Sequence, residues 1–271
     1  MYIFAPVAAI ILTTLVYGLS VSSSVVMLVL LLMYCILNVS QGREKAAADR
    51  DLAMASNIQE TILPRIFPYL PERDEFDIFA SMTPAKEVGG DFYDFFMIDD
   101  DHIAIVIADV SGKGMPAALF MMVARTLIKN QAQSASSDMD PGHILSEVND
   151  QLCDGNEMGL FVTAWLGIIT LSTGHMVYSS AGHEYPALSE NGKEYVLRVE
   201  RNMPPLATME GLKFKTRDID LKHGDTLFIY TDGVAEATDV NGELFGTDRM
   251  LDALNADPSA ELETLDKSVR D

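Results

Sequence analysis

The sequence predicts an α+β domain with mostly antiparallel sheet, preceded by an apolar N-terminal segment. None of the 19 basic and 40 acidic residues lies within positions 1–42, so the chain divides into an apolar piece and a charged domain. In that domain strand-like runs come first, two helical segments follow, and further strand-like runs lead to two final helices. This grouping is typical of α+β domains, whereas parallel α/β domains alternate the two kinds of element.

The composition excludes several classes of protein. The 271 residues carry a formal net charge of −21. A chain this acidic is short of the Lys and Arg that bind nucleic-acid phosphates, so we expect no nucleic-acid partner. Cys35 and Cys153 lie far apart in the sequence, which argues against a disulfide scaffold or a cysteine zinc site. The five histidines are scattered without paired spacing, so a zinc hydrolase is disfavoured.

The apolar segment, residues 1–42, predicts membrane insertion. Its uncharged stretch exceeds the roughly 20 residues that one spanning helix needs, and polar residues interrupt it at 18–24. We expect a hairpin of two short helices, 2–18 and 23–40; a single long tilted helix is the alternative. The lack of basic residues ahead of the apolar stretch argues against a cleaved signal peptide. Lys and Arg residues follow directly, so the positive-inside rule predicts an inner (cytoplasmic) membrane protein whose domain faces the cytoplasm.

A linker, residues 43–70, is predicted to join the membrane segment to the domain. Residues 44–63 are rich in Ala, Glu, Lys and Gln, contain neither Gly nor Pro, and end before Pro64, as expected of a helix. A 4-3-4-3 spacing, typical of the contact face of a helix pair, relates Ala48, Leu52, Ala55, Gln59 and Ile62. Two interpretations stay open: a solvated amphipathic stalk, or a homodimerising helix that couples membrane events to the domain.

The domain itself, residues 71–271, shows apolar runs separated by turn-forming Gly, Asn, Asp and Ser residues. Strands are expected at residues 76–82, 92–98, 102–109, 161–171, 175–181, 194–199, 212–220 and 226–231. Helices are expected at residues 116–133, 141–154, 247–255 and 260–270.

Three glycine-flanked acids mark the predicted site of this domain. Asp91 follows two glycines, while Asp109 and Asp232 each come at the end of an apolar run. An acid in such a place is costly to bury unless it is paired or bound to a cation. Carboxylates that converge from several strand ends suit Mg²⁺ or Mn²⁺, and two such ions about 3.5–4 Å apart can clamp a phosphoryl group. For any one Asp a turn or helix-cap role is the simpler interpretation; the threefold recurrence favours a metal site.

Two segments resemble known sequence signatures, but neither indicates the corresponding function. Residues 112–117 fit the dinucleotide pattern GxGxxA, but Asp109 would face the pyrophosphate and the order of elements is not βαβ. The Gly-Gly-Asp at 89–91 begins like the cyclase signature GGDEF, but Phe92 and Tyr93 replace its Glu-Phe. Both interpretations are disfavoured.

In this order the motifs resemble those of bacterial PPM-type (protein phosphatase 2C-like) serine/threonine phosphatases of the stage II sporulation protein E (SpoIIE) class. The resemblance covers about residues 49–249. Its matching segments are IQETILP at 58–64, EVGGDFYD at 87–94, DVSGKG at 109–114, AGH at 181–183 and YTDGV at 230–234.

The resemblance implies a fold and a chemistry. The fold is a β-sandwich of two antiparallel sheets flanked by helices (αββα), with metal ions at one edge. Asp109 would bridge two Mn²⁺ or Mg²⁺ ions, Asp91 and the Val110 carbonyl would complete one ion, and Asp232 would bind the other. The three aspartates are thus the predicted catalytic residues, and metal-bound hydroxide would attack phosphorus directly. The implied substrate is phosphoserine or phosphothreonine on a regulatory partner, often an anti-sigma-factor antagonist.

The chain departs from the family pattern in two places. No Asp-Asp-x-Thr-like motif follows Asp232, and the segment that resembles Gly-x-Pro-Leu-Gly reads Met-Pro-Pro-Leu-Ala at 203–207. We therefore expect a C-terminally truncated phosphatase domain with one ion short of a ligand. The alternative function is a catalytically inactive, membrane-tethered binding module with the same fold.

Three residues near the motifs have two interpretations each. His183 is expected to stabilise a turn, with proton transfer or phosphate binding as the alternative. Lys113 either meets phosphate or serves only the loop. Arg125, on the helix after the second motif, is expected to be a surface residue.

Overall fold

The computed structural model describes residues 7–12, 23–65, 67, 69–83, 88–134, 139–201 and 203–270. The chain divides into two compact units, Met1–Met54 and Ala55–Asp271. The second unit carries both sheets and all the predicted site residues.

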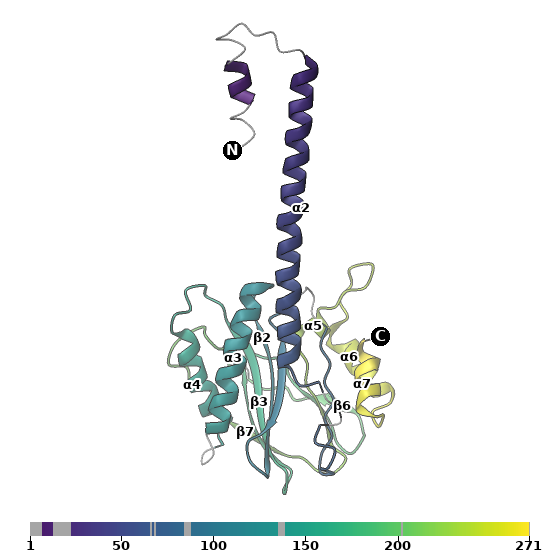
Figure 1. Ribbon diagram of the computed structural model, residues 1–271. Coiled ribbons are helices and arrows are strands. Elements are labelled where there is room, and N and C mark those ends of the chain that lie inside the picture. The colour runs from purple at the N-terminus through teal and green to yellow at the C-terminus, as the bar shows by residue number, and fades with distance from the viewer. Residues whose placement is uncertain are drawn as a thin grey trace. The chain divides into compact units, whose positions relative to one another are not determined.

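One long helix, α2 (Ser23–Ile62), runs without a break from the apolar stretch into the linker (Figure 1). The helices expected at 23–40 and 44–63 are thus continuous, and Gly42, which lies between them, does not interrupt the helix although glycine disfavours helix interiors. Among the described residues α2 is also the one helix long and apolar enough to cross a membrane. The expected hairpin is not clear: residues 7–12 are helical, but most of the predicted first helix and its turn lie outside the described residues.

Five antiparallel strands form the larger sheet of the second unit. They are β1 (Phe92–Met97), β2 (His102–Val110), β3 (Val162–Thr170), β4 (His175–Ala181) and β7 (Arg217–Asp220), in that spatial order. Three further strands form a smaller antiparallel sheet. They are β6 (Tyr195–Leu197), β5 (Ala187–Ser189) and β8 (Thr226–Phe228), in that spatial order.

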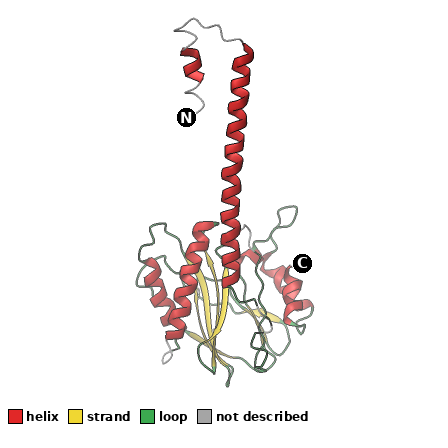
Figure 2. Ribbon diagram, viewed as in Figure 1, coloured by secondary structure: helices red, strands yellow, loops and turns green. Residues whose placement is uncertain are grey.

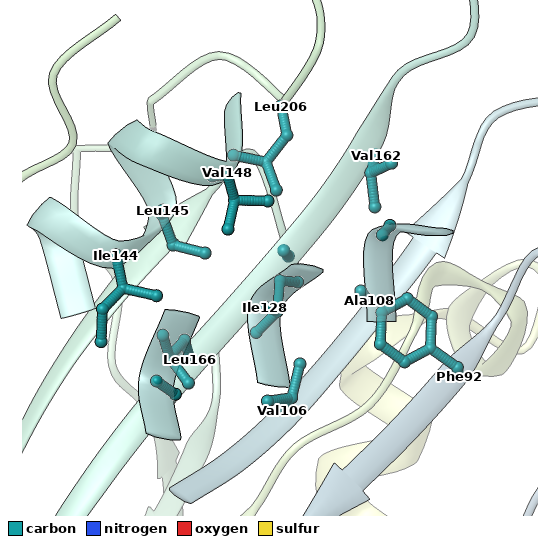
Figure 3. Close-up of a cluster of buried hydrophobic side chains, with 14 of the residues drawn as sticks. Phe92, Val106, Ala108, Ile128, Ile144, Leu145, Val148, Val162, Leu166 and Leu206 are labelled. Carbon is teal, nitrogen blue, oxygen red and sulfur yellow. The ribbon is translucent and has the colours of Figure 1, made fainter. Parts of the chain in front are cut away.

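Helices α3 (Met115–Ser134) and α4 (Pro141–Cys153) cover one face of the larger sheet (Figures 1 and 2). Asp140 caps α4 by accepting hydrogen bonds from two backbone N–H groups, and Pro141 occupies the first turn, where its missing N–H costs nothing. Alternate residues of the strands point toward these helices, as an antiparallel sheet with one buried face requires. Figure 3 shows the result: side chains of both helices meet those of β1, β2 and β3 in one apolar core.

The other face of the larger sheet packs against the smaller sheet. Trp165 and Met176 of the larger sheet lie there, with Leu227 of the smaller one. Beyond the smaller sheet, α6 (Gly246–Ala256) and α7 (Leu262–Arg270) close a further apolar cluster. The layers are therefore helices, sheet, sheet and helices, which confirms the predicted α+β fold with antiparallel sheets.

Some element predictions were wrong. Residues 76–82 form no strand; Phe79 instead packs on Phe67 with ring centroids 5.2 Å apart, and Phe67 packs on Phe95 of β1, so apolar residues there are partly buried without ladder hydrogen bonds. Of the predicted strand 212–220 only β7 forms, and the three-residue strand β5 was not anticipated.

Candidate active site

Two of the predicted aspartates are brought together by the pairing of β1 and β2. Phe92 pairs with Ala108, so the same antiparallel register, continued by one residue, places Asp91 opposite Asp109. Directly opposed residues project on the same face of a sheet. Asp109 is two residues from Ile107, which lies in the cluster between the sheets, so both carboxylates face the smaller sheet.

Gly90 allows this close approach. A Cβ atom at this position would lie 2.5 Å from the Val110 carbonyl oxygen and 3.2 Å from Asp109 Oδ1. Only a residue without a side chain fits that gap, because carbon and oxygen do not approach so closely without a bond. The Val110 carbonyl and the Asp109 carboxylate thus both face the backbone that carries Asp91.

The third aspartate comes from the smaller sheet. Asp232 is the first residue of the short helix α5 (Asp232–Ala235), shortly after β8, and it is exposed. The hydroxyl of Thr231, the residue before it, hydrogen-bonds Asp91. The structure therefore brings together residues 91, 109 and 232 from three segments that are far apart in the sequence.

The carboxylates affect one another electrostatically. Burial, followed by the charges of Asp91 and Asp232, raises the pKa of Asp109 to about 7. Burial and the charge of Asp232 raise the pKa of Asp91 as well. The Lys113 ammonium lowers the pKa of both groups, so it lies close enough to partly offset their repulsion. An uncompensated set of carboxylates of this kind favours binding of a cation.

The donor set fits a hard divalent cation. Asp91 Oδ1 is buried and has no hydrogen-bond partner, which leaves one carboxylate oxygen available as a ligand. All candidate donors are oxygens, the ligands that Mg²⁺ and Mn²⁺ prefer. Within the described parts of the chain, no three His, Cys, Asp or Glu side chains converge closely enough to enclose an ion by themselves. Mg²⁺ commonly takes only one or two carboxylates and keeps several waters, so the open arrangement is compatible with it.

His183 lies between the two sheets beside these carboxylates. It is 2% exposed, and its Nδ1 atom is 3.0 Å from the Thr163 hydroxyl, whose residue pairs with Asp109 in the register of β2 and β3. It also hydrogen-bonds the backbone of Tyr230. Burial lowers the pKa of His183 to about 4, so the imidazole is neutral at pH 7.

Glu184 is a residue of this region that sequence reasoning missed. Burial and the neighbouring charges of Asp232 and Glu236 raise its pKa, so it is a fourth carboxylate beside the site. The one sequence signal that could have indicated Glu184 is its position directly after the AGH segment at 181–183, which matches a family motif. However, no feature of the local sequence indicates that this turn lies next to Asp232.

Arg125 is not the surface residue that was expected. Its side chain is 14% exposed and contacts Asp94 of β1, with Nη2 2.8 Å from Oδ2. Lys129, one helical turn later, reaches the same oxygen at 3.5 Å. Asp94 pairs with Val106 and so faces α3, which explains why α3 presents cations to it. Arg125 therefore belongs to the packing between sheet and helix.

This fold, with carboxylates at one edge of two stacked antiparallel sheets, is that of PP2C-like phosphatases. The SiaA-PP2C domain of Pseudomonas aeruginosa superposes with a TM-score of 0.68 over 83% of this chain and 87% of that one, at 24% identity. Residues 99–271 match the family described as Stage II sporulation protein E. The chain therefore belongs to the SpoIIE family of PP2C-like bacterial serine phosphatases.

Two curated relatives are similar over most of this chain. Protein IcfG of Synechocystis sp. is 32% identical over 240 residues, which is 80% of this chain and 37% of IcfG. Phosphoserine phosphatase RsbU of Bacillus subtilis is 30% identical over 195 residues, which is 72% of this chain and 56% of RsbU. The chain thus spans between a third and three fifths of the length of these relatives.

Proposed function

We propose that the protein is a membrane-tethered, metal-dependent phosphatase that removes phosphate from serine or threonine of a regulatory protein. The observation that carries this proposal is the opposed pair Asp91 and Asp109, whose pKa values are raised by burial and by the charges of neighbouring carboxylates, Asp232 among them, together with an unpartnered oxygen on Asp91. Carboxylates perturbed in this way are typical of functional sites. Similarity to a phosphoserine phosphatase supports the choice of reaction.

Four groups would hold the cations. By the family motif, the carboxylates of Asp91, Asp109 and Asp232 and the carbonyl of Val110 would hold divalent cations. When bound, two divalent ions supply charge neutralisation at the phosphoryl oxygens and activation of water. Because Gly90 has no side chain, the Val110 carbonyl and the Asp109 carboxylate stay close to the Asp91 backbone.

The other residues of the site orient and balance these groups. Lys113 supplies positive charge beside Asp91 and Asp109, where it can also attract a phosphoryl group. Neutral His183 hydrogen-bonds both the hydroxyl of Thr163, the pairing partner of Asp109, and the backbone of Tyr230. Cys153 is not one of these residues: it ends α4, where burial and the charges of Asp150 and Glu210 raise the pKa of its thiol, so it stays protonated and is a poor nucleophile. Direct hydrolysis by water agrees with this arrangement.

The substrate and the location are inferred from the same family and from α2. A phosphorylated anti-sigma-factor antagonist or a similar regulatory protein is the proposed partner. The apolar part of α2 supports anchoring in the inner membrane, and the basic residues after position 42 support a cytoplasmic domain. Residues 44–62 of α2 remain a candidate for pairing with a second copy.

The test is Mn²⁺-dependent hydrolysis of a serine phosphopeptide by the full chain in detergent micelles. Asp109→Asn should lower the rate by about 100-fold or more. Loss of a residue that only supports a metal ligand costs up to about 100-fold, and Asp109 is proposed to be a ligand itself. Asp252→Asn, an exposed aspartate of α6, is the matched control and should leave the rate unchanged. A rate that is unaltered in Asp109→Asn would exclude the mechanism.

A catalytically inactive binding module is the second candidate. It is favoured by one observation: no three acidic, His or Cys side chains among the described residues enclose an ion. Isothermal titration with Mn²⁺ separates the two functions. Heat of binding that disappears in Asp109→Asn supports the phosphatase, whereas no uptake at millimolar Mn²⁺ supports the inactive module.

A further inference from the structure

The end of α2 is fastened to the loop that carries Asp91. The Gln59 carboxamide makes two hydrogen bonds to one residue: Nε2 donates to the Gly89 carbonyl at 2.8 Å, and Gly89 N–H donates to Oε1 at 3.1 Å. Gln59 is only 3% exposed, although the neighbouring residues of the helix are mostly open to solvent. Both polar atoms of this buried carboxamide are hydrogen-bonded, and leaving either one without a partner would lower the stability of the fold.

A second contact reaches the other side of Asp91. The Tyr93 hydroxyl donates to the Pro64 carbonyl at 2.9 Å, directly after the end of α2. Leu63, between these contacts, is 5% exposed and belongs to the same core as Phe92. Residues 59–64 therefore bind the chain two positions before and two positions after Asp91.

The bound loop has little stiffness of its own. Two consecutive glycines precede Asp91, and glycine loses more conformational freedom on ordering than any other residue. Gly90 must nevertheless hold its place, since it lies against the Val110 carbonyl and Asp109 Oδ1. The two hydrogen bonds from Gln59 hold the backbone of Gly89, the residue directly before this point.

We propose that Gln59 is a positioning residue for the cation site: by holding Gly89 it keeps Asp91 opposite Asp109, and so sets the affinity of the site for Mn²⁺. This inference rests on the proposed function. It also means that the ordering of the last turns of α2 is coupled to the positioning of Asp91 in the site. A helix end that moves away from Gly89 releases Asp91.

The alternative is that Gln59 only adds to the stability of the fold. The two roles are separated by measuring Mn²⁺ binding and thermal unfolding on the same samples. Gln59→Met keeps the length and the helix preference of the side chain while removing both hydrogen bonds. Gln133→Met, at an exposed position of α3, is the matched control for the chemical change.

The experiment is isothermal titration of the full chain in detergent micelles with MnCl₂. In Gln59→Met we expect the dissociation constant for Mn²⁺ to rise about tenfold, as loss of a group that orients a metal ligand usually causes. The phosphatase rate should recover at high Mn²⁺, because the ligands themselves are intact. Gln133→Met should bind Mn²⁺ like the parent.

A dissociation constant within twofold of the parent in a folded Gln59→Met protein would overturn the inference while leaving the proposed function intact. A parent protein that neither binds Mn²⁺ nor hydrolyses the phosphopeptide would overturn both. If Gln59→Met does not fold, Gln59→Glu and Tyr93→Phe carry the test: the first keeps the acceptor for Gly89 N–H, and the second removes only the contact to Pro64. Unchanged Mn²⁺ affinity in both would equally overturn it.

Discussion

The imidazole of His183 and the hydroxyl of Thr163 lie 3.0 Å apart beside the carboxylates, and both come from the larger sheet, Thr163 in β3 and His183 two residues after β4. Thr163 is the pairing partner of Asp109, and His183 also bonds the backbone of Tyr230, two residues before Asp232. The spacing between the carboxylates of the two sheets therefore depends on a buried, neutral imidazole.

Replacing Thr163 tests this connection. Thr163→Val keeps the shape of the side chain but removes the hydroxyl, so a buried contact of His183 is lost. We expect the domain to lose about 1–3 kcal/mol of stability, and the phosphatase rate to fall with it. Trp165, the single tryptophan, is buried two residues away, and its fluorescence during urea unfolding reports the domain alone. Thr163→Ser retains the hydroxyl and should behave like the parent; equal losses in Val and Ser would contradict the prediction.

The raised pKa of Asp109 predicts a pH dependence of the metal-free protein. Between its ordinary pKa of 3.8 and its folded value of about 7, the folded state holds the proton more tightly than the unfolded state. Stability contributed by this group is therefore present at low pH and lost as pH rises through 7. Burial of neutral His183, whose folded pKa is lower than its ordinary 6.5, acts in the opposite direction over a similar range.

A difference measurement isolates the Asp109 contribution. Without metal, Asp109→Asn should become increasingly more stable than the parent as pH rises from about 4 to about 7, because asparagine carries no charge. Excess Mn²⁺ should reverse this order, since only the parent gains by binding. Urea unfolding at a series of pH values, with and without EDTA, measures both. A stability difference that does not vary with pH would show that Asp109 is not perturbed.

The buried pair of Asp94 and Arg125 predicts a large effect of a single substitution. Asp94→Ala leaves the nearly buried Arg125 guanidinium without its partner at 2.8 Å, which should cost about 3–5 kcal/mol. The double substitution Asp94→Leu with Arg125→Met should recover most of this loss, because apolar side chains of similar size suit the face between β1 and α3. Additive losses in the double variant would refute the pairing.

Gly90→Ala should damage the site through sterics alone. The new Cβ would lie 2.5 Å from the Val110 carbonyl oxygen, so the loop must move away from β2. We expect Mn²⁺ affinity to fall at least tenfold, together with a lower unfolding midpoint. Gly42→Ala, whose Cβ meets nothing within 4 Å, is the control and should change neither property. Titration calorimetry with MnCl₂ gives the comparison.

Local patterns were sufficient for much of the fold and for the principal candidate residues. Apolar runs bounded by turn-forming residues predicted β2, β3 and β4, because both signals act over a few neighbouring residues. The glycine-flanked acids at strand ends predicted a shared site for residues 91, 109 and 232, and the electrostatic effect of Asp232 on Asp91 and Asp109 is compatible with that prediction. The three-residue β5 was not recognised, whereas β6 and β8, equally short, lie within longer predicted runs.

Other features depend on contacts that no local pattern encodes. An arginine on a helix is usually a surface residue. Arg125 is largely buried only because Asp94, on the face of β1 toward α3, pairs with it. Glu184 follows a turn motif, and only the path of the smaller sheet brings it beside Asp232. Gln59 fits a helix seam by spacing, yet its carboxamide binds Gly89, thirty positions away.

By itself, then, the order of residues determined the strands, the helices and which acids stand at strand ends, because backbone periodicity and turn chemistry act over a few neighbours. Tertiary structure alone decided which distant groups share a dry interface, and hence which carboxylates are perturbed and which side chains hold them. The physical reason is that burial and short-range electrostatics are properties of surroundings assembled from separate segments of the chain.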